Sequence, residues 1–243
     1  AIRIASGRPV LDSSEEMRFF CYYAALKTWV SGGAINNAGM LLQWFKDNFG
    51  SSETMESGRR GLDTFEIMSE EASRVAPGSG NLVVVPFFSG ERFPIRDWNT
   101  RGVVFGLTYA HGREHLIRAL MESVAFTLRS IQDALEEERL SIRELRIGGG
   151  GARSTVWRQI VTDVLEKPVA RTRVEEASAL GAAILGAISV GLYDGLDSAV
   201  KGMVRVLRRE TPRARASATY RKHYGIYREL YRICQPCFRR LSS

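Results

Sequence analysis

Apolar residues recur along the chain at two spacings, one typical of strands and one typical of helices. Residues 2–4 and 18–30 are rich in β-branched and aromatic types with turn residues between them, which predicts the opening strands of a sheet. The uncharged run 82–88 also has strand length. Residues 111–139 instead carry leucine, isoleucine and valine at three- and four-residue steps, which predicts a long amphipathic helix.

Two shorter helices are preceded by polar residues that can cap them. Asn36 and Asn37 stand just before a helical pattern that starts near Ala38. Asp63 stands in the same relation to a helix predicted to end near Val75. Both helices are therefore expected to begin with a side-chain cap.

The second half of the chain alternates short strands and helices. A strand is predicted at 145–147, a helix at 154–165 and a strand around Val169. The uncharged stretch 177–193 is broken by glycines and falls short of the roughly 20 apolar residues of a membrane span, so we expect a buried helix. This alternation predicts an α/β domain with a mixed sheet flanked by helices.

The net charge of +7 is concentrated at one end of the chain. Residues 201–243 hold twelve Lys or Arg against Glu210 and Glu229. Tyrosines in this segment recur at three- and four-residue steps, as on a packed helical face: Tyr220, Tyr224, Tyr227 and Tyr231. We therefore expect an amphipathic helix without a nucleic-acid or membrane partner; polyanion contact and a subunit interface remain the alternatives.

Length and cysteine content set further bounds. A chain of 243 residues can bury one large core or two small ones. Its three cysteines are Cys21, Cys234 and Cys237, an odd number with no secretory pattern before them, which favours a reducing, cytoplasmic setting. The lone CxxC at 234–237 is weak grounds for a metal site. The absence of an initiator methionine at Ala1 suggests an excised piece.

The strongest local feature is a run of four glycines, 148–151, between a predicted strand and a predicted helix. Without Cβ atoms, the backbone can lie against a planar base or a phosphate, and the following helix presents free N–H groups. A tight turn that needs only positive φ angles is the alternative. The Rossmann pattern would need a glycine in place of Ser154, and no GxxxxGK[ST] occurs.

Two further patterns are weaker indications of a ligand or metal site. Gly39 and Gln43 stand one helical turn apart, so both can face one ligand, although the residues alone favour a packing glycine and a solvated glutamine. His111 and His115 with Glu114 match the HxxEH zinc pattern, but neighbouring arginines disfavour a dication, and we predict no metal ligand.

No carboxylate is convincingly placed for acid or base work. Glu91 and Asp97 lie in a polar loop, and Glu175 and Glu176 precede a helix, where capping is the expected role. No catalytic residue is therefore predicted.

Several segments together resemble the FGGY family of carbohydrate kinases, which have the actin-like ATPase (ribonuclease H-like) fold and phosphorylate sugars and polyols with MgATP. The resemblance extends from the first residues to about Tyr193. It is carried by 90–94, 101–108, His111, His115, 118–119, Glu122, 149–154, 157–159 and 175–183. Within the family, residues 32–37 are most similar to gluconate kinases, then to xylulose kinases.

The resemblance implies a nucleotide site. Gly39 and Gln43 fall where the family contacts ATP near its phosphates, and Gly150 and Ser154 fall at the adenosine pocket. Gly149, Gly151 and Ala152 would flank the base through their backbone. Some members carry asparagine where this chain has Ser154.

The resemblance also implies the domain organisation. Residues 1–200 would form the ATP-binding half of a two-domain kinase, followed by a basic helical extension at 201–243. The catalytic base and most sugar contacts would belong to an N-terminal kinase domain, so this fragment alone is expected to be inactive. ATP with Mg²⁺ and a sugar or sugar acid, gluconate before xylulose, are the expected ligands, and a homodimer is possible. A non-catalytic nucleotide-binding or assembly domain is the alternative.

Overall fold

The computed structural model describes residues 1–241. Its chain opens with a three-stranded antiparallel sheet in the order β1-β3-β2, made by β1 (Ile2–Ser6), β2 (Phe20–Ala25) and β3 (Thr28–Gly33). Ile2 pairs with Gly33 at one end of the ladder. A Cβ on Gly33 would lie 2.7 Å from the Ile131 side chain, so this glycine allows the sheet to approach the central helix closely.

Three helices follow: α1 (Gly39–Phe49), α2 (Ser51–Arg60) and α3 (Thr64–Ser73). The predicted cap of α3 is confirmed, because Asp63 forms a capping box with Glu66. The predicted cap of α1 is wrong. The N-cap is Ala38 without a side-chain bond, because Asn37 is buried and donates to the Gly90 carbonyl at 2.8 Å instead.

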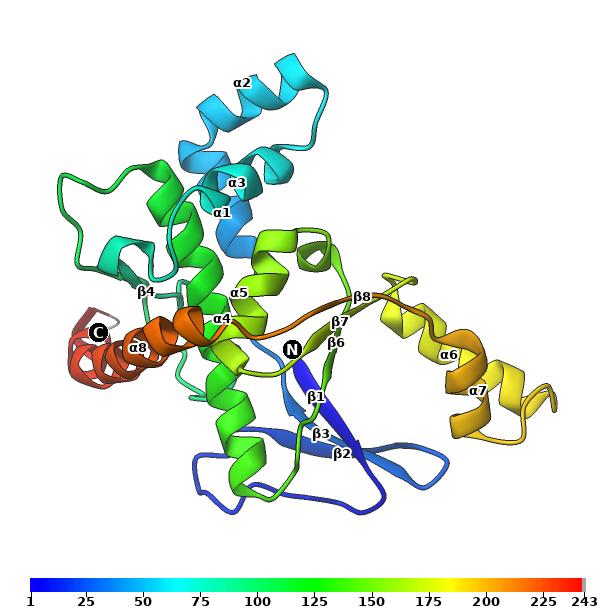
Figure 1. Ribbon diagram of the computed structural model, residues 1–243. Helices are drawn as coiled ribbons and strands as arrows, with labels where there is room; N and C mark the ends of the chain where they lie inside the picture. Colours follow the sequence, from blue (N-terminus) through cyan, green and yellow to red (C-terminus); the bar gives the residue numbers. More distant parts are fainter. Residues whose placement is uncertain (242–243) are drawn as a thin grey trace.

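The long α4 (Arg113–Glu137) runs through the middle of the molecule (Figure 1). Before it come the short η1 (Ser79–Asn81) and an antiparallel pair, β4 (Val83–Val85) and β5 (Val103–Phe105). β4 is shorter than the predicted strand 82–88 because Pro86 has no N–H for a ladder. Both α1 and β4 pack on α4, which makes this helix the centre of the core.

The glycine run directly follows the first strand of a second three-stranded sheet. β6 (Leu145–Ile147) pairs in parallel with β7 (Val169–Thr172), which pairs antiparallel with β8 (Val206–Glu210). Between β6 and β7 come η2 (Gly150–Ala152) and α5 (Thr155–Leu165), which packs on α4. The predicted order of strand, glycine loop, helix and strand is confirmed.

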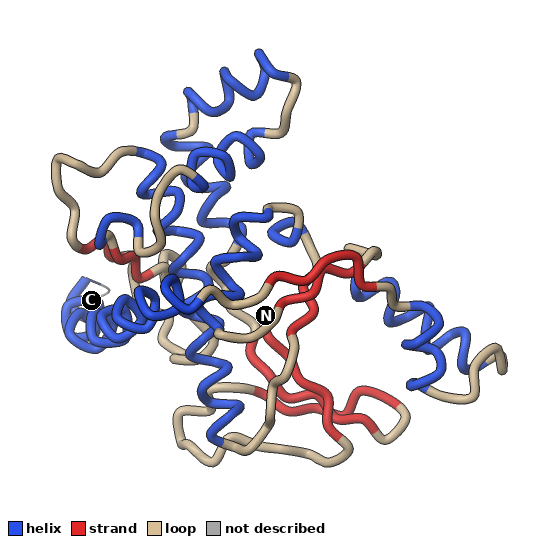
Figure 2. Tube along the Cα trace, in the orientation of Figure 1, coloured by secondary structure: helices blue, strands red, loops and turns tan. Residues whose placement is uncertain are grey.

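The helix predicted at 177–193 is exposed rather than buried. α6 (Ala177–Ser189) and α7 (Leu196–Met203) pack on each other and project from the second sheet (Figures 1 and 2). The prediction of a buried helix was wrong, because Ile184 is the one residue of α6 that is buried. Among residues 1–241, no helix is long and apolar enough to cross a membrane.

The chain ends in α8 (Ala214–Leu241), which packs on α4, α5 and β4. The predicted packed face is confirmed, since Tyr220, Tyr224 and Tyr227 are buried. β8 belongs to the same sheet as β6, so the segment after residue 200 supplies both a strand and a helix. The division at residue 200 stays a prediction, and residues 242–243 lie outside the described part.

Candidate functional site

The glycine loop is open to solvent. A Cβ on Gly149 or Gly150 would meet no atom within 4 Å, and Gly149 has φ +81°, a left-handed conformation that favours glycine. Ser154 is the N-cap of α5, where its hydroxyl oxygen accepts a hydrogen bond from the Trp157 N–H at 3.2 Å. The backbone here can therefore receive a flat ligand beside the start of a helix.

Ala152 differs from its neighbours because its polar groups are already used. Its side chain is buried, its N–H donates to the Gly149 carbonyl at 3.0 Å, and its carbonyl accepts from Arg158 at 2.6 Å. Gly151 is half-buried, and a Cβ there would lie 3.2 Å from the Trp157 ring. The buried side chain and the hydrogen bonds of Ala152 therefore fix the loop in place, whereas Gly149 and Gly150 remain exposed.

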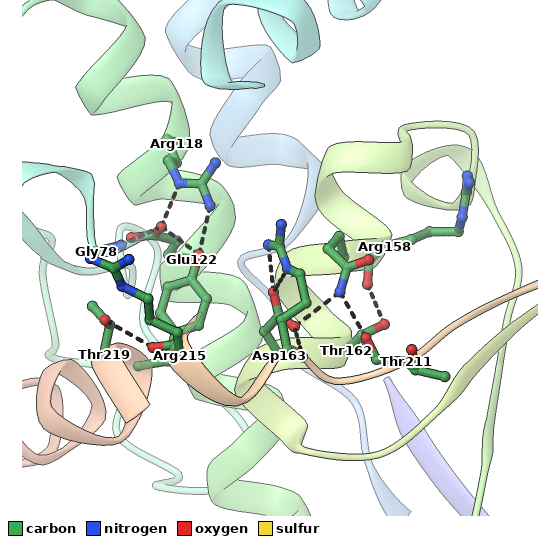
Figure 3. Close-up of polar contacts among 12 residues, drawn as sticks. Gly78, Arg118, Glu122, Arg158, Thr162, Asp163, Thr211, Arg215 and Thr219 are labelled. Atoms are coloured by element: carbon green, nitrogen blue, oxygen red, sulfur yellow. Dashed lines mark hydrogen bonds and ion pairs between the residues drawn. The ribbon is translucent and has the colours of Figure 1, made fainter. Parts of the chain in front are cut away.

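Arg158 anchors the loop from beneath (Figure 3). Its guanidinium donates to the carbonyls of Ala152 and Arg153 and pairs with Glu210 of β8, Nε to Oε1 at 2.9 Å. Both side chains of the pair are almost fully buried. This role of Arg158 was not predicted from the sequence. Arg158 precedes the buried Val161 by three residues and the buried Leu165 by seven, so it lies on the apolar face of α5. A charged residue on an apolar helix face is the pattern that could have revealed a buried ion pair.

A second ion pair network holds the outer side of the loop. Glu175 pairs with Arg153 and with Arg171, each at 2.9 Å, and its carbonyl accepts from the Gly149 N–H at 3.2 Å. The pKa of Glu175 is lowered by its hydrogen bond with Arg153 and then by that with Arg171. The expectation that Glu175 and Glu176 cap α6 was wrong, because Glu176 is the N-cap residue but makes no side-chain cap bond.

The other two predicted site residues lie on α1. Gly39 is its first residue and is exposed, and Gln43 follows one turn later with its amide donating to Asp47 at 2.6 Å. Helices α1 and α5, which carry the two groups of site residues, both pack on α4. Because the N-cap of α1 uses no side chain, its first N–H groups remain available to a ligand.

The family residues on α4 form a buried polar network rather than a reactive site (Figure 3). The Glu122 carboxylate accepts from Arg118 at 2.8 Å, Tyr220 at 2.8 Å, the Gly78 N–H at 3.0 Å and Ser79 at 2.9 Å. Burial, and then the charge of Glu122, raise the pKa of Tyr220 far above its ordinary value. The network joins α4, α8 and the loop before β4.

The histidines of the HxxEH pattern serve the start of α4. His111 accepts from the Thr108 N–H at 2.9 Å, and His115 accepts from the Gly112 N–H at 3.1 Å. Within residues 1–241, no three His, Cys, Asp or Glu side chains are grouped to hold a metal ion. Glu91 is also structural, since it is buried and accepts from the Asn36 N–H at 2.7 Å.

Glu53, Glu71 and Arg113 form a titratable cluster at the junction of α2, α3 and α4. The Glu53 side chain is fully buried and pairs with Arg113, Nε to Oε1 at 2.9 Å. Desolvation, and then the nearby charge of Glu53, raise the pKa of Glu71 to about 7. A cavity of about 490 Å³, lined by Glu71, Arg113 and His115 among others, lies beside the cluster.

Glu71 makes stability depend on pH. Its pKa rises from 4.5 to about 7 on folding, so the folded state binds more protons between these pH values and stability falls as pH rises through this window. Glu71→Gln is expected to stabilise the chain by about 1 kcal/mol more at pH 8 than at pH 5, after allowance for solvent screening. Urea unfolding at both pH values measures this. Glu70→Gln, at an exposed pair with Arg60, should show no such difference, and equal behaviour of the two variants would contradict the prediction.

The fold and the open loop define an α/β domain of the kind that forms one half of an actin-like ATPase. Residues 17–190 match the model of the FGGY family of carbohydrate kinases, C-terminal domain. The chain belongs to this family.

Curated relatives agree with this assignment. The chain is 38% identical to gluconokinase of Bacillus subtilis (strain 168) over 100% of this chain and 47% of the relative. It is 29% identical to xylulose kinase of the same organism, over 80% of this chain and 37% of that relative. The chain therefore spans about half the length of the curated relatives it matches.

Solved structures show the same fold. Gluconate kinase from Lactobacillus acidophilus superposes with a TM-score of 0.86 at 24% identity, covering 98% of this chain and 46% of that one. Xylulose kinase from Rhodospirillum rubrum gives a TM-score of 0.82 at 28% identity, with the same coverage. The predicted fold class and family are confirmed.

Proposed function

We propose that this chain is the ATP-binding half of a kinase that transfers the γ-phosphoryl group of ATP to a hydroxyl of a sugar or sugar acid. Gluconate is the favoured acceptor, because the gluconokinases are 38% and 35% identical to the chain and the xylulose kinase is 29% identical. Xylulose or another pentulose is the second candidate.

The observation that carries the proposal is the exposed, Cβ-free backbone at Gly149 and Gly150, leading into the N-terminus of α5. Adenine would lie against Gly149, Gly150 and Gly151, and the Ser154 hydroxyl, which uses its oxygen as a cap, retains its proton for donation. Ala152 would support this surface from below.

The phosphates would extend toward the start of α1. Free N–H groups there, beginning at Gly39, favour negative charge, and Gln43 stands one turn further on. Mg²⁺ would arrive bound to the ATP phosphates. This chain would therefore bind and orient the nucleotide, and it contributes to transfer by placing the γ-phosphoryl group at the edge of the domain.

The remaining half of the full-length kinase would supply the sugar pocket and the carboxylate base. Closure of the two halves would exclude water from the reacting groups. On this proposal the 243-residue chain alone binds adenine nucleotide weakly and phosphorylates no sugar. The proposed setting of the full-length protein is the cytoplasm.

Gly150→Trp is expected to weaken ATP binding at least about 10-fold, which corresponds to about 1.4 kcal/mol. A ring at this exposed position would cover the surface proposed for adenine, and Gly150 is not among the residues with positive φ, so tryptophan fits its backbone. Calorimetric titration of the 243-residue chain with ATP measures the change.

Gly225→Trp provides the matched control, because Gly225 lies on α8 and a Cβ there also meets no atom within 4 Å. Its affinity should equal that of the unmodified chain. Equal affinity in the Gly150→Trp variant would place the nucleotide elsewhere and overturn the assignment of the loop.

A further inference from the structure

Arg153 follows the glycine loop, and its side chain reaches the residue that binds the start of that loop. The guanidinium pairs with the Glu175 carboxylate, Nε to Oε2 at 2.9 Å. The Glu175 carbonyl in turn accepts from the Gly149 N–H at 3.2 Å. The backbone of Arg153 is also fixed, because its N–H donates to the Gly150 carbonyl at 3.1 Å and its carbonyl accepts from Arg158 at 3.1 Å. The guanidinium is therefore held beside the loop.

The ion pair borders the open surface of the loop without covering it. A Cβ on Gly149 or Gly150 would meet no atom within 4 Å, so the side chains of the ion pair lie beside this space rather than in it. The Arg153 side chain is 74% exposed, which leaves most of it accessible to a further partner. A ligand placed on the two glycines would therefore have the Arg153 guanidinium as a neighbour.

Arg153 is not needed to hold Glu175 in place. Arg171 pairs with the other oxygen of the same carboxylate at 2.9 Å, and the Arg171 side chain is less exposed than that of Arg153. Exposed ion pairs add little stability, because solvent screens them. Two arginines and one glutamate leave one positive charge beside the loop, which favours an anionic ligand such as a nucleotide.

A guanidinium is suited to contact the face of a nucleobase. It is planar and weakly hydrated, so it stacks on flat π systems, including bases. The attraction acts when the cation lies within about 6 Å of the ring centroid. The long, flexible side chain of Arg153 can reach over a ring placed on Gly149 and Gly150, because no atom occupies the space above these glycines.

We propose that Arg153 stacks on the adenine of bound ATP, so that the base lies between the guanidinium and the backbone of Gly149 and Gly150. This inference rests on the proposed nucleotide site. The ion pair with Glu175 keeps the guanidinium beside the base, and Arg171 remains as the partner of Glu175 when Arg153 moves over the ring. Because stacking contacts the face of a base and not its edges, this contact does not distinguish adenine from guanine.

Arg153→Ala, titrated with adenosine, ATP and inorganic tripolyphosphate, separates stacking from a contact to the phosphates. Affinity for adenosine and affinity for ATP are expected to fall by the same factor, about 5-fold, because both ligands carry the base. Affinity for tripolyphosphate should not change. Titrations of the 243-residue chain followed by NMR measure all three affinities, since this method detects weak binding.

Arg221→Ala is the matched control, because Arg221 also forms an exposed ion pair with a glutamate, Glu166 at 2.6 Å, but lies on α8. It removes the same charge and should leave all three affinities unchanged. Arg153→Lys keeps the charge and loses the planar group, so its adenosine affinity should stay below that of the unmodified chain. The urea midpoint of both Arg153 variants should not move, which excludes a misfolded loop as the cause.

Three results would overturn the stacking role. One is a loss of ATP and tripolyphosphate affinity in Arg153→Ala with adenosine unaffected, which would make Arg153 a phosphate contact. The others are full adenosine affinity in Arg153→Lys and unchanged affinity for all three probes in Arg153→Ala. If Gly150→Trp still weakens ATP binding in that last case, the proposed nucleotide site stands and only the stacking role fails. If neither variant changes affinity, the nucleotide binds elsewhere and both proposals fail.

Discussion

Arg158→Leu is expected to lower the free energy of unfolding by about 3 kcal/mol, because it leaves the buried Glu210 carboxylate with only the exposed Arg208, at 3.5 Å, as an ion-pair partner. The carbonyls of Ala152 and Arg153 would lose their donors in the same step. Urea unfolding followed by circular dichroism measures the loss. Since these carbonyls shape the glycine loop, ATP affinity should fall as well.

Arg209→Leu is the matched control for this variant. Arg209 lies on β8 next to Glu210 and pairs with Glu144 at 2.8 Å, but its side chain is exposed, so the expected loss is below about 1 kcal/mol. The double variant Arg158→Leu/Glu210→Leu should recover part of the stability, because it removes both buried charges together. If Arg158→Leu cost no more than Arg209→Leu, the anchoring role would be refuted.

Glu122→Leu is the second variant with a large expected effect, about 3–5 kcal/mol in unfolding free energy. The carboxylate is 1% exposed and accepts from Arg118, Tyr220, Gly78 and Ser79. Leucine would leave the Arg118 charge buried and three neutral donors without their acceptor. Urea unfolding again gives the value.

Glu136→Leu tests whether burial, rather than loss of a carboxylate from α4, causes the effect. Glu136 lies on the same helix and pairs with Lys167 at 2.8 Å where solvent reaches both side chains, so a change below about 1 kcal/mol is expected. Comparable losses of unfolding free energy in Glu122→Leu and Glu136→Leu would show that the buried network stabilises the fold no more than an exposed ion pair does. Glu122→Gln should fall between them, since an amide keeps the shape and part of the acceptor capacity.

Much of the candidate site could be predicted because its features are local. A strand, four glycines and a capped helix follow one another within about twenty residues, and each is constrained by its own backbone requirements. The role of Arg158 could not be predicted with equal ease, because its partner Glu210 lies on β8, far along the chain. The α1 cap was predicted wrongly for the same reason. The Asn37 side-chain amide donates hydrogen bonds to Gly90 and Glu91, which lie beside it only in the folded chain.

Local sequence patterns were enough to predict the α/β class, the Asp63 cap, the packed tyrosine face of α8 and most of the strands and helices, because each depends on side-chain periodicity or a neighbouring backbone group; α2, β5, α7 and β8 were missed. The tertiary structure alone decided the strand order within the sheets, the exposure of α6 and the two buried ion pairs. The reason is physical: strand partners, burial and charge pairing depend on which distant surfaces meet, and no local pattern contains that information.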